Sequence, residues 1–344
     1  MSTQETPQTM DRRHFLKLSG ILGVGFAAGS LLPISEAVAF NKELYKVTKT
    51  RQGMGTFVSV TVMHPSKMEA EEIIGKAFEE MDRVTMLMDR YRPDSPVGVL
   101  NKEGSLTEVP PDLAAVIKRS LYFHEQSQGA FDITVQPVVD LYKQHFAANN
   151  SPPSEKELEK ALALVDAGAM SFDGKSIRFK TPGMGITLDG IAKGYIIDCG
   201  AELMKKHGIK HALINAGGDI RVAGGKEGGS PWKVGIQNPD RVGPYVDIVG
   251  MNNGAVATSG NYEVYFDQEK LYHHIVNPVT GLSPTQSDSV TVMAPTVMDA
   301  DALSTAVFVL EPVAGKRFIE GVPGTACLIL GRDKQRIASN AWPT

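Results

Sequence analysis

The sequence predicts an α+β fold with largely antiparallel sheets and flanking helices. Most of the short apolar strands expected in the second half of the chain follow one another without a helix between each pair, which favours antiparallel pairing. Helical segments with capping signals precede and interrupt these strands. The 344 residues are 42% hydrophobic and 22% charged, so the chain has enough apolar material for a sizeable core.

Charge and cysteine content exclude several classes of function. The formal net charge is -4 and the pI is near 6.1, with no run of Lys and Arg, so we do not expect a nucleic-acid partner. The two cysteines, Cys199 and Cys327, lack a C-x-x-C motif and the His/Cys spacing of a zinc site. We expect both to be buried apolar residues rather than a disulfide or a soft-metal site.

Residues 1–39 have the pattern of an export signal. Paired arginines at 12 and 13 followed by F-L-K resemble a twin-arginine signal, and a Gly-rich apolar run leads to A-V-A at 37–39. An ordinary secretory signal is the alternative. The apolar run is shorter than the ~20 residues of a membrane span, and no cysteine near Ala39 could carry a lipid. We therefore expect a periplasmic protein without a lipid anchor, whose working domain is residues 40–344.

The first elements of this domain follow from alternation and capping. The segment M-G-T-F-V-S-V-T-V at 54–62 alternates like a half-buried strand. Ser66 with Glu69 forms a capping box, and apolar residues then recur at helical spacing up to Met88. A second helix starts with Pro111 in its first turn and leads to A-F-D at 130–132.

Short strands dominate the rest of the chain. A polar linker at 149–154 precedes a capping-box helix that ends near residue 165, which we interpret as a surface insertion. Two further helices are expected at about 190–207 and 297–310. Strands are expected at 176–180, 185–188, 212–215, 232–237, 246–250, 255–258, 271–276 and 289–293.

The segment T-V-M-D-A-D-A-L-S-T at 296–305 is the first candidate for chemistry. Asp301 and Thr305 are four residues apart, so on a helix they share one face and present a carboxylate and a hydroxyl together. Two oxygen ligands suit a hard cation such as Mg²⁺. The same segment also fits a purely structural interpretation, with Thr296 as N-cap, Asp299 completing a capping box, and Asp301 favouring the positive end of the helix.

Three other segments carry a candidate site. T-L-D-G-I-A-K-G-Y at 187–195 turns through glycine into a helix with Lys193 in its first turn, which favours a phosphate or is a plain strand–helix joint. A-G-G-D at 216–219 lacks the dinucleotide-binding order, so its glycines either let the backbone approach a ligand or form a tight turn. The adjacent histidines at 273 and 274 would point to opposite faces of a strand, so at most one serves a given site.

Taken together, these segments resemble the FAD:protein FMN transferase family, also called the ApbE family. The match extends over essentially the whole domain through eight short motifs in order. They are M-G-T-F, Y-x-x-x-S at 91–95, G-A-F-D-I-T-V at 129–135, D-G-I-A-K-G-Y, N-A-G-G-D, A-T-S-G-N-Y, H-I-V-N-P-V-T-G and A-D-A-L-S-T.

The resemblance implies a tunnelling-type α+β fold and a set of residues that bind the substrate FAD. By motif matching, the flavin nucleotide is held by Met54, Tyr91, Ala130, Phe131, Asp132, Lys193 and Ile275. Thr187 occupies the place where many members have a nucleotide-contacting aspartate, and Asp189 lies two residues later. The resemblance leaves open which of these two makes that contact.

The resemblance also implies the ligands and the base. The metal, Mg²⁺ or alternatively Mn²⁺, would be held by Asp301, the Thr305 hydroxyl and the Gly190 carbonyl, with Ser304 nearby. His274 would activate the acceptor hydroxyl. Lys193 would stabilise charge on the pyrophosphate, as phosphoryl transfer requires.

The implied activity is the transfer of FMN from FAD to a threonine or serine of another protein, with AMP released. The implied acceptors are flavoproteins of exported or membrane-bound electron-transfer complexes that carry a motif like D-x-x-[ST]-G-[AS]-[ST]. Two alternatives remain: a metal-dependent FAD pyrophosphatase that yields free FMN and AMP, and a periplasmic flavin-binding protein without turnover.

Overall fold

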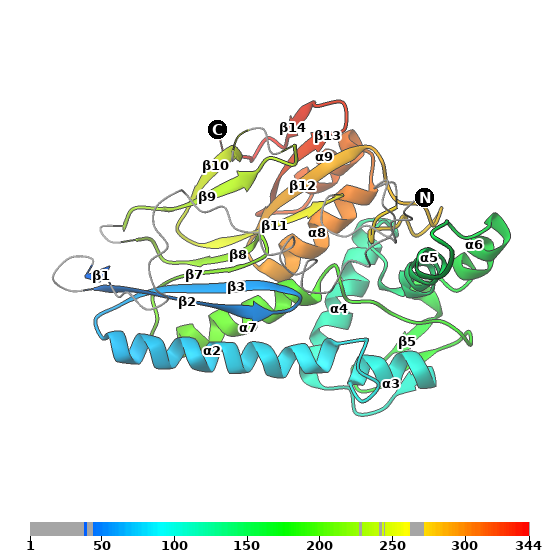
Figure 1. Cartoon of the computed structure of the whole chain (residues 1–344), viewed down its shortest axis with the longest axis horizontal. Coiled ribbons are helices and arrows are strands. Elements are labelled where there is room, and N and C mark those ends of the chain that lie inside the picture. Colours follow the sequence, from blue (N-terminus) through cyan, green and yellow to red (C-terminus); the bar gives the residue numbers. More distant parts are fainter. Residues whose placement is uncertain are drawn as a thin grey trace, which may run out of the picture.

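The structure is a computed structural model (Figure 1). It describes residues 38–39, 44–226, 229–240, 243, 245–261 and 272–343. The predicted export signal at 1–39 lies outside the described residues, except for 38 and 39. Among the described residues, no helix is both long enough and apolar enough to span a bilayer.

A nine-stranded sheet forms the centre of the molecule. Its strand order is β1-β2-β3-β7-β8-β11-β12-β13-β14, and every described pair of neighbouring strands is antiparallel. The predicted α+β class with antiparallel sheets is therefore confirmed. The strands are β1 (Val38–Ala39), β2 (Tyr45–Gly53), β3 (Thr56–His64), β7 (His211–Ala216), β8 (Asp219–Ala223), β11 (Gly254–Gly260), β12 (Ser287–Ala294), β13 (Ala326–Gly331) and β14 (Arg336–Ala338).

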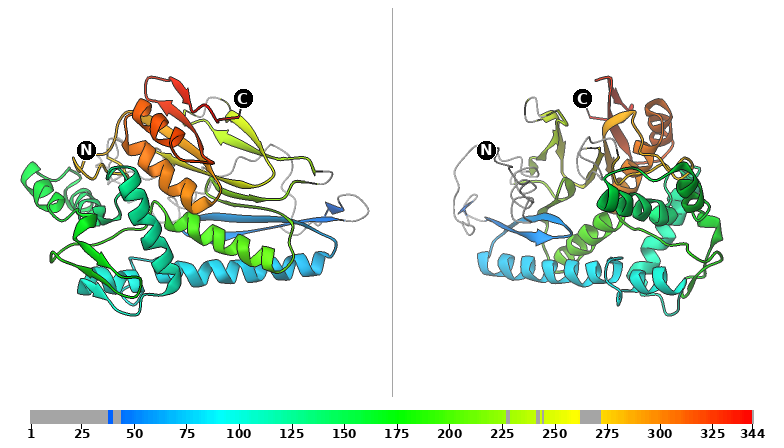
Figure 2. Two further views of the ribbon diagram at one scale, coloured as in Figure 1. Left: turned by 180° about the vertical axis from the view of Figure 1, so that it is seen from behind. Right: turned by 45° about the vertical axis from the view of Figure 1, so that its right-hand side comes forward.

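Helices cover one face of this sheet and a small ribbon covers the other (Figure 1 and Figure 2). The helix face is packed by α2 (Lys67–Met88), α7 (Ala192–Lys206) and α8 (Val297–Val309) around the larger apolar core. On the opposite face, β9 (Trp232–Gln237) and β10 (Tyr245–Met251) bury a second cluster that includes Trp232, Ile220 and Leu328. The sheet is thus buried on both sides.

The remaining elements gather at one end of the molecule or at its edge. They include a small sheet in the order β4-β6-β5. They are α3 (Pro96–Glu103), β4 (Ser105–Leu106), α4 (Pro111–Gln126), the short 3-10 helix η1 (Ile133–Val135), α5 (Gln136–Asn149), α6 (Glu155–Leu162), η2 (Ala167–Ala169), β5 (Met170–Phe172), β6 (Ile177–Phe179) and α9 (Pro312–Glu320).

Helix starts were predicted well where a cap marks them. The Ser66 side chain accepts from the Glu69 amide, Pro111 begins α4, and Ser154 with Glu157 forms a complete capping box at α6. Other elements were missed, including the strands β2 and β13, the helices α5 and α9, which also carry a proline in the first turn, and α3, which Ser95 caps. As expected of apolar cysteines, Cys327 is buried and Cys199 is packed against the core, and burial raises the pKa of these thiols to about 11 and about 12.

Two strand predictions were wrong for a shared physical reason. At 185–188 the backbone of Ile186 exchanges hydrogen bonds of 2.8 and 2.9 Å with the Asn101 side chain, and the Thr187 amide donates to Ile133. At 272–276 the His273 backbone is bonded to the Ser283 hydroxyl. In both segments loop and side-chain partners replace a strand neighbour. The strand predicted from residue 54 starts two residues later.

The paired glycines of A-G-G-D form a tight turn. Gly217 and Gly218 have φ angles of 62° and 101° and connect β7 to β8, as a two-residue hairpin loop with positive φ requires. The neighbouring β2–β3 turn places Met54 and Gly55 at φ angles of 52° and 73°. A side chain on Gly217 would lie 2.7 Å from the Thr56 hydroxyl, so the two turns pack against each other.

We predict that Asp198→Ala lowers the free energy of unfolding by about 2 kcal/mol, because two N–H groups lose a buried partner. The Asp198 carboxylate accepts hydrogen bonds from the backbone amides of Val297 and Met298, at 3.1 and 2.9 Å, and so caps α8 from a different helix. Urea unfolding measures the change. Asp94→Ala is the control, since that exposed carboxylate contacts only the Arg92 side chain and the first turn of α3 is capped by Ser95. Equal stability of the two variants would contradict the capping role.

Candidate active site

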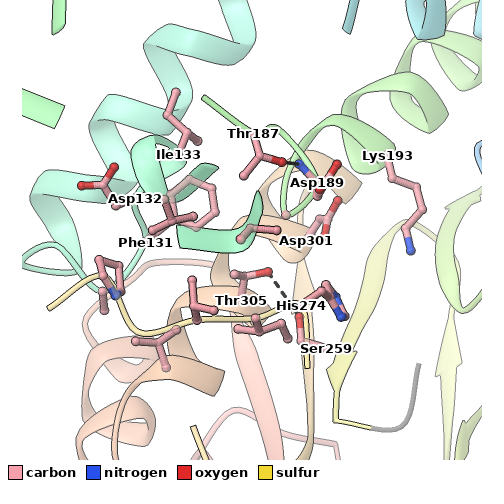
Figure 3. A pocket seen from close by; sticks show the side chains of 18 of the residues that line it. Phe131, Asp132, Ile133, Thr187, Asp189, Lys193, Ser259, His274, Asp301 and Thr305 are labelled. Atoms are coloured by element: carbon pink, nitrogen blue, oxygen red, sulfur yellow. Dashed lines mark hydrogen bonds between the residues drawn. The ribbon is translucent and has the colours of Figure 1, made fainter. Parts of the chain in front are cut away.

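One pocket brings together segments that are far apart in the sequence (Figure 3). It encloses roughly 760 Å³ of space not filled by atoms, including some open solvent, which is within the range of small-molecule sites. Its walls come from the loop before η1, the segment entering α7, the end of β11, the loop 274–278 and one face of α8. The lining residues are Ala130, Phe131, Asp132, Ile133, Val135, Val139, Thr187, Asp189, Gly190, Lys193, Thr258, Ser259, Gly260, His274, Ile275, Val276, Pro278, Asp301, Thr305 and Val309.

Asp301 and Thr305 project from one face of α8 into this pocket, as their spacing predicts. Asp301 is 6% exposed, and its Oδ2 accepts a hydrogen bond of 3.1 Å from the Gly194 amide. The Thr305 hydroxyl packs against Gly190, where an added Cβ would lie 2.9 Å from Oγ1. A carboxylate, a hydroxyl and a glycine backbone therefore meet at one wall.

The structural interpretation of this segment also holds in part. Thr296 is the N-cap of α8, and its side chain accepts from the Asp299 amide. The Asp299 carboxylate, however, turns away to form a two-bond ion pair with Arg119 at 2.7 and 2.8 Å. This ion pair replaces the reciprocal half of a capping box, and Asp198 caps the two preceding amides, those of Val297 and Met298.

The start of α7 differs from the open anion site that its sequence suggests. The Ala192 amide donates to the Leu188 carbonyl and the Gly194 amide donates to Asp301, so these two N–H groups are already used. Lys193 instead carries the positive charge into the pocket. Its Nζ lies 3.2 Å from Oδ2 of Asp219, a carboxylate that is 2% exposed and directly follows the paired glycines. These two amides are therefore not available to a phosphate, and the role of Lys193 toward a phosphate stays a prediction.

Contacts of the Asp132 side chain hold the loop 130–132 in place. The Asp132 side chain accepts from the amide and the hydroxyl of Thr134, at 2.7 and 2.6 Å, and so caps η1. Its other oxygen lies 3.2 Å from His124 Nδ1, and this contact raises the pKa of His124 above its ordinary value. Phe131 is buried and packs edge-on against Phe123. Asp132 thus fixes the shape of this wall.

Thr187 and Asp189 both line the pocket, but Thr187 is buried and Asp189 is exposed. Thr187 is 8% exposed, and its hydroxyl accepts from the Asp189 amide at 3.3 Å. The Asp189 side chain is 53% exposed and lies 3.6 Å from the guanidinium of Arg90. Asp189 is therefore placed at the mouth and Thr187 deeper.

The two histidines face opposite ways although no regular strand forms there. His273 is 2% exposed, its Nε2 lies 3.0 Å from the Pro284 carbonyl, and its ring stands edge-on to Phe308. His274 and Ile275 line the pocket. Of the pair, His274 is the one in a position to act on a bound molecule.

Within the part of the chain that the structure describes, three predicted site residues are not in the lining: Met54, Tyr91 and Ser304. Met54 is partly buried at the β2–β3 turn, and Ser304 is fully buried behind Thr305. Tyr91 is 61% exposed, with its ring between Arg90 and Lys143 at 4.5 and 4.4 Å. Their proposed ligand roles stay predictions.

Sequence reasoning missed several lining residues. Thr258, Ser259 and Gly260 belong to a motif that was used only to establish the resemblance, so a signal for them was present. Ile133, Val135, Val276 and Pro278 also lie within quoted motifs, whereas Val139 and Val309 lie outside them and reach the wall through tertiary packing. Among the described residues, no group of three His, Cys, Asp or Glu side chains is close enough to hold a metal ion.

Comparison with known proteins gives one consistent result. Residues 54–329 match the model of the ApbE family. The chain is 33% identical over 310 residues to the FAD:protein FMN transferase of Treponema pallidum, covering 83% of this chain and 84% of that protein. It is 30% identical over 312 residues to the enzyme of the same name from Haemophilus influenzae, covering 85% and 87%.

Solved structures agree with the sequence matches. The ApbE protein of Thermotoga maritima superposes with a TM-score of 0.77 at 32% identity, covering 87% of this chain and 97% of that one. The flavin transferase ApbE of Vibrio cholerae gives 0.75 at 27% identity, covering 87% and 98%. The family-model match, the similar enzymes and the shared fold show that the chain belongs to the ApbE family.

Proposed function

We propose that this protein is a Mg²⁺-dependent transferase that splits FAD and joins the FMN half to a threonine or serine hydroxyl of another protein. Relatives that share most of its length are named FAD:protein FMN transferase. The observation that carries the proposal is that one pocket gathers Asp301, Thr305, Lys193 and His274, the groups that such a transfer needs.

The donor atoms of the pocket fit a hard cation. Asp301 supplies a buried carboxylate, Thr305 a hydroxyl and Gly190 a backbone carbonyl, all of them oxygen donors. The Thr305 side chain already lies against the Gly190 backbone. When bound, Mg²⁺ supplies positive charge to the pyrophosphate oxygens of FAD. We assign these three residues to it.

The remaining residues account for the other requirements of the reaction. The acceptor hydroxyl oxygen forms a bond to the FMN phosphorus, and the bond from that phosphorus to the bridging oxygen breaks, so that AMP leaves. His274 accepts the hydroxyl proton, which then passes to solvent. Lys193, held by Asp219, places an ammonium where negative charge accumulates. No redox change occurs, and the products are phosphoester-linked FMN and AMP.

The export-like N-terminus supports a location outside the cytoplasm. We propose that the protein reaches the periplasm by the twin-arginine route and modifies subunits of exported or membrane-bound electron-transfer complexes. Acceptors would carry a motif like D-x-x-[ST]-G-[AS]-[ST]. Covalent attachment suits such proteins, because a flavin bound only by contacts can diffuse away from an exported protein.

We predict that the purified protein, given FAD, Mg²⁺ and a small acceptor with this motif, makes the acceptor fluorescent after denaturation and releases one AMP per attached flavin. Gel fluorescence and AMP chromatography measure the two products. An acceptor with alanine in place of the motif Ser/Thr is the control. AMP with only free FMN would identify a pyrophosphatase, and neither product despite tight FAD binding would identify a flavin-binding protein.

Asp301→Asn is predicted to lower both transfer and FAD cleavage at least about 100-fold while FAD still binds, because the charge that holds the cation is lost. The asparagine oxygen can still accept the Gly194 hydrogen bond, so α7 keeps its partner. Asp299→Asn is the matched control, since this carboxylate lies on the same helix, pairs with Arg119 and does not line the pocket. The rate of AMP release measures the effect of each substitution. Full activity of Asp301→Asn would show that this carboxylate has no role in the mechanism.

His274→Gln is predicted to slow transfer about 10²–10⁴-fold near neutral pH, because the acceptor hydroxyl loses its base. The decline in wild-type rate at acid pH, where a histidine base becomes protonated, should disappear in the variant. Single-turnover rates over a pH series measure both effects. His145→Gln, which removes a histidine 3.4 Å from Glu157 outside the pocket lining, should keep the wild-type profile. An unchanged profile in His274→Gln would show that another group takes the proton.

A further inference from the structure

Three hydroxyl groups form a continuous hydrogen-bonded row in the wall of the pocket that carries Thr305. Ser259, at the end of β11, lies 2.8 Å from Ser304 and 3.3 Å from Thr305, measured between side-chain oxygens. Ser304 donates to the backbone carbonyl of Asp301 at 2.9 Å. Figure 3 shows the contact between Ser259 and Thr305 as a dashed line. The row thus links the Thr305 hydroxyl, through Ser259 and Ser304, to the backbone carbonyl of Asp301.

Each hydroxyl has one proton, so the three contacts fix its direction along the row. A carbonyl oxygen only accepts, and therefore the Ser304 proton points to Asp301. Ser259 must then donate to Ser304, because Ser304 has no second proton to give. It follows that Thr305 donates to Ser259. One arrangement alone satisfies all three hydrogen bonds.

The direction of these hydrogen bonds determines whether the Thr305 hydroxyl presents its proton or its lone pairs to the pocket. Its proton faces backward to Ser259, so the lone pairs of Oγ1 are left for the side where Gly190 and the cavity lie. The reverse direction would turn the Thr305 proton into the cavity, toward the positive charge of a bound cation. That arrangement would also remove the donor from the Asp301 carbonyl. Burial excludes competing water, since Ser304 is 0% and Ser259 is 9% exposed.

We propose that Ser259 and Ser304 are positioning residues that hold the Thr305 hydroxyl with its lone pairs toward the divalent cation. The proposal rests on the proposed function, because it assumes that Asp301 and Thr305 bind that cation. It changes the role expected for Ser304 from a ligand to a residue acting through Thr305. Ser259, which sequence reasoning did not select, becomes the central member of the row.

The test is Mn²⁺ binding, measured from the electron paramagnetic resonance signal of the free ion, with and without FAD. Ser259→Ala and Ser304→Ala are each expected to weaken Mn²⁺ binding about tenfold, as loss of groups that orient a ligand does. The double variant should lose about as much as either single variant, since both act through one row. FAD affinity without a divalent cation, followed by flavin fluorescence, should stay unchanged in Ser304→Ala, whose hydroxyl does not line the pocket.

Two controls separate this effect from general destabilisation. Ser120→Ala removes a matched hydroxyl: Ser120 is 1% exposed on α4 and donates to the Val116 carbonyl at 2.8 Å, away from the pocket. It should leave Mn²⁺ binding unchanged at a similar cost in melting temperature. Ser259→Thr keeps the hydroxyl and should restore most of the affinity. Testing the two serines separately keeps the proposal open to refutation where one variant fails to fold.

The outcomes distinguish this proposal from the function on which it rests. If the wild type binds Mn²⁺, Asp301→Asn does not, and both serine variants bind like the wild type, the positioning role is overturned while the metal site stands. If the wild type itself does not bind Mn²⁺ with or without FAD, both the cation assignment and the positioning role are overturned. Weaker binding in the serine variants alone, with Ser120→Ala unaffected, supports the proposal.

Discussion

The site depends on an exchange of carboxylates between two helices. The Asp198 carboxylate of α7 accepts hydrogen bonds from the first two amides of α8. The Asp301 carboxylate of α8 accepts a hydrogen bond from the Gly194 amide in the first turn of α7. Each helix therefore satisfies amides that the other cannot bond internally. A side chain at Gly194 would come within 2.4 Å of the Val297 carbonyl, so only glycine permits this approach. The exchange fixes Asp301, Thr305 and Lys193 relative to one another before any ligand binds.

Burying acidic groups in this way has an electrostatic cost that the surroundings offset. Burial raises the pKa of Asp198 to about 6, while the two amide hydrogen bonds and Arg221 act in the opposite direction. Asp219 is buried more deeply, with its side chain 2% exposed against 16% for Asp198, and it is paired with Lys193. The positive ends of both helices favour the charged carboxylates. A pocket that concentrates negative charge beside one lysine is suited to attract a divalent cation together with an anionic substrate.

Local signals predicted α2, α6 and α8 from their N-caps, although the same signal at Ser95 did not lead to α3, and strand predictions failed where the hydrogen-bond partner is distant. Thr296, Ser66 and Ser154 each bond to an amide three residues away, which a sequence shows directly. The loop at 185–188 is apolar like a strand, but its hydrogen bonds go to Asn101 and Ile133, which no local pattern reveals. A side chain at Gly185 would displace the end of the Gln136 side chain, a contact that tertiary packing creates.

Motif order predicted which residues meet in the pocket, because it carries information that periodicity does not. Ten of the residues taken from motifs meet in one cavity: Ala130, Phe131, Asp132, Thr187, Gly190, Lys193, His274, Ile275, Asp301 and Thr305. A motif specifies residue types but not hydrogen bonds, so the hydroxyl row that includes Thr305 is identified only from the distances between side-chain oxygens. Tyr91 lies outside the cavity, but Arg90 contacts both Tyr91 and the pocket residue Asp189. The groups assigned to the proposed transfer thus lie inside the cavity, and the aromatic ring lies outside it, connected to the pocket residue Asp189 through Arg90.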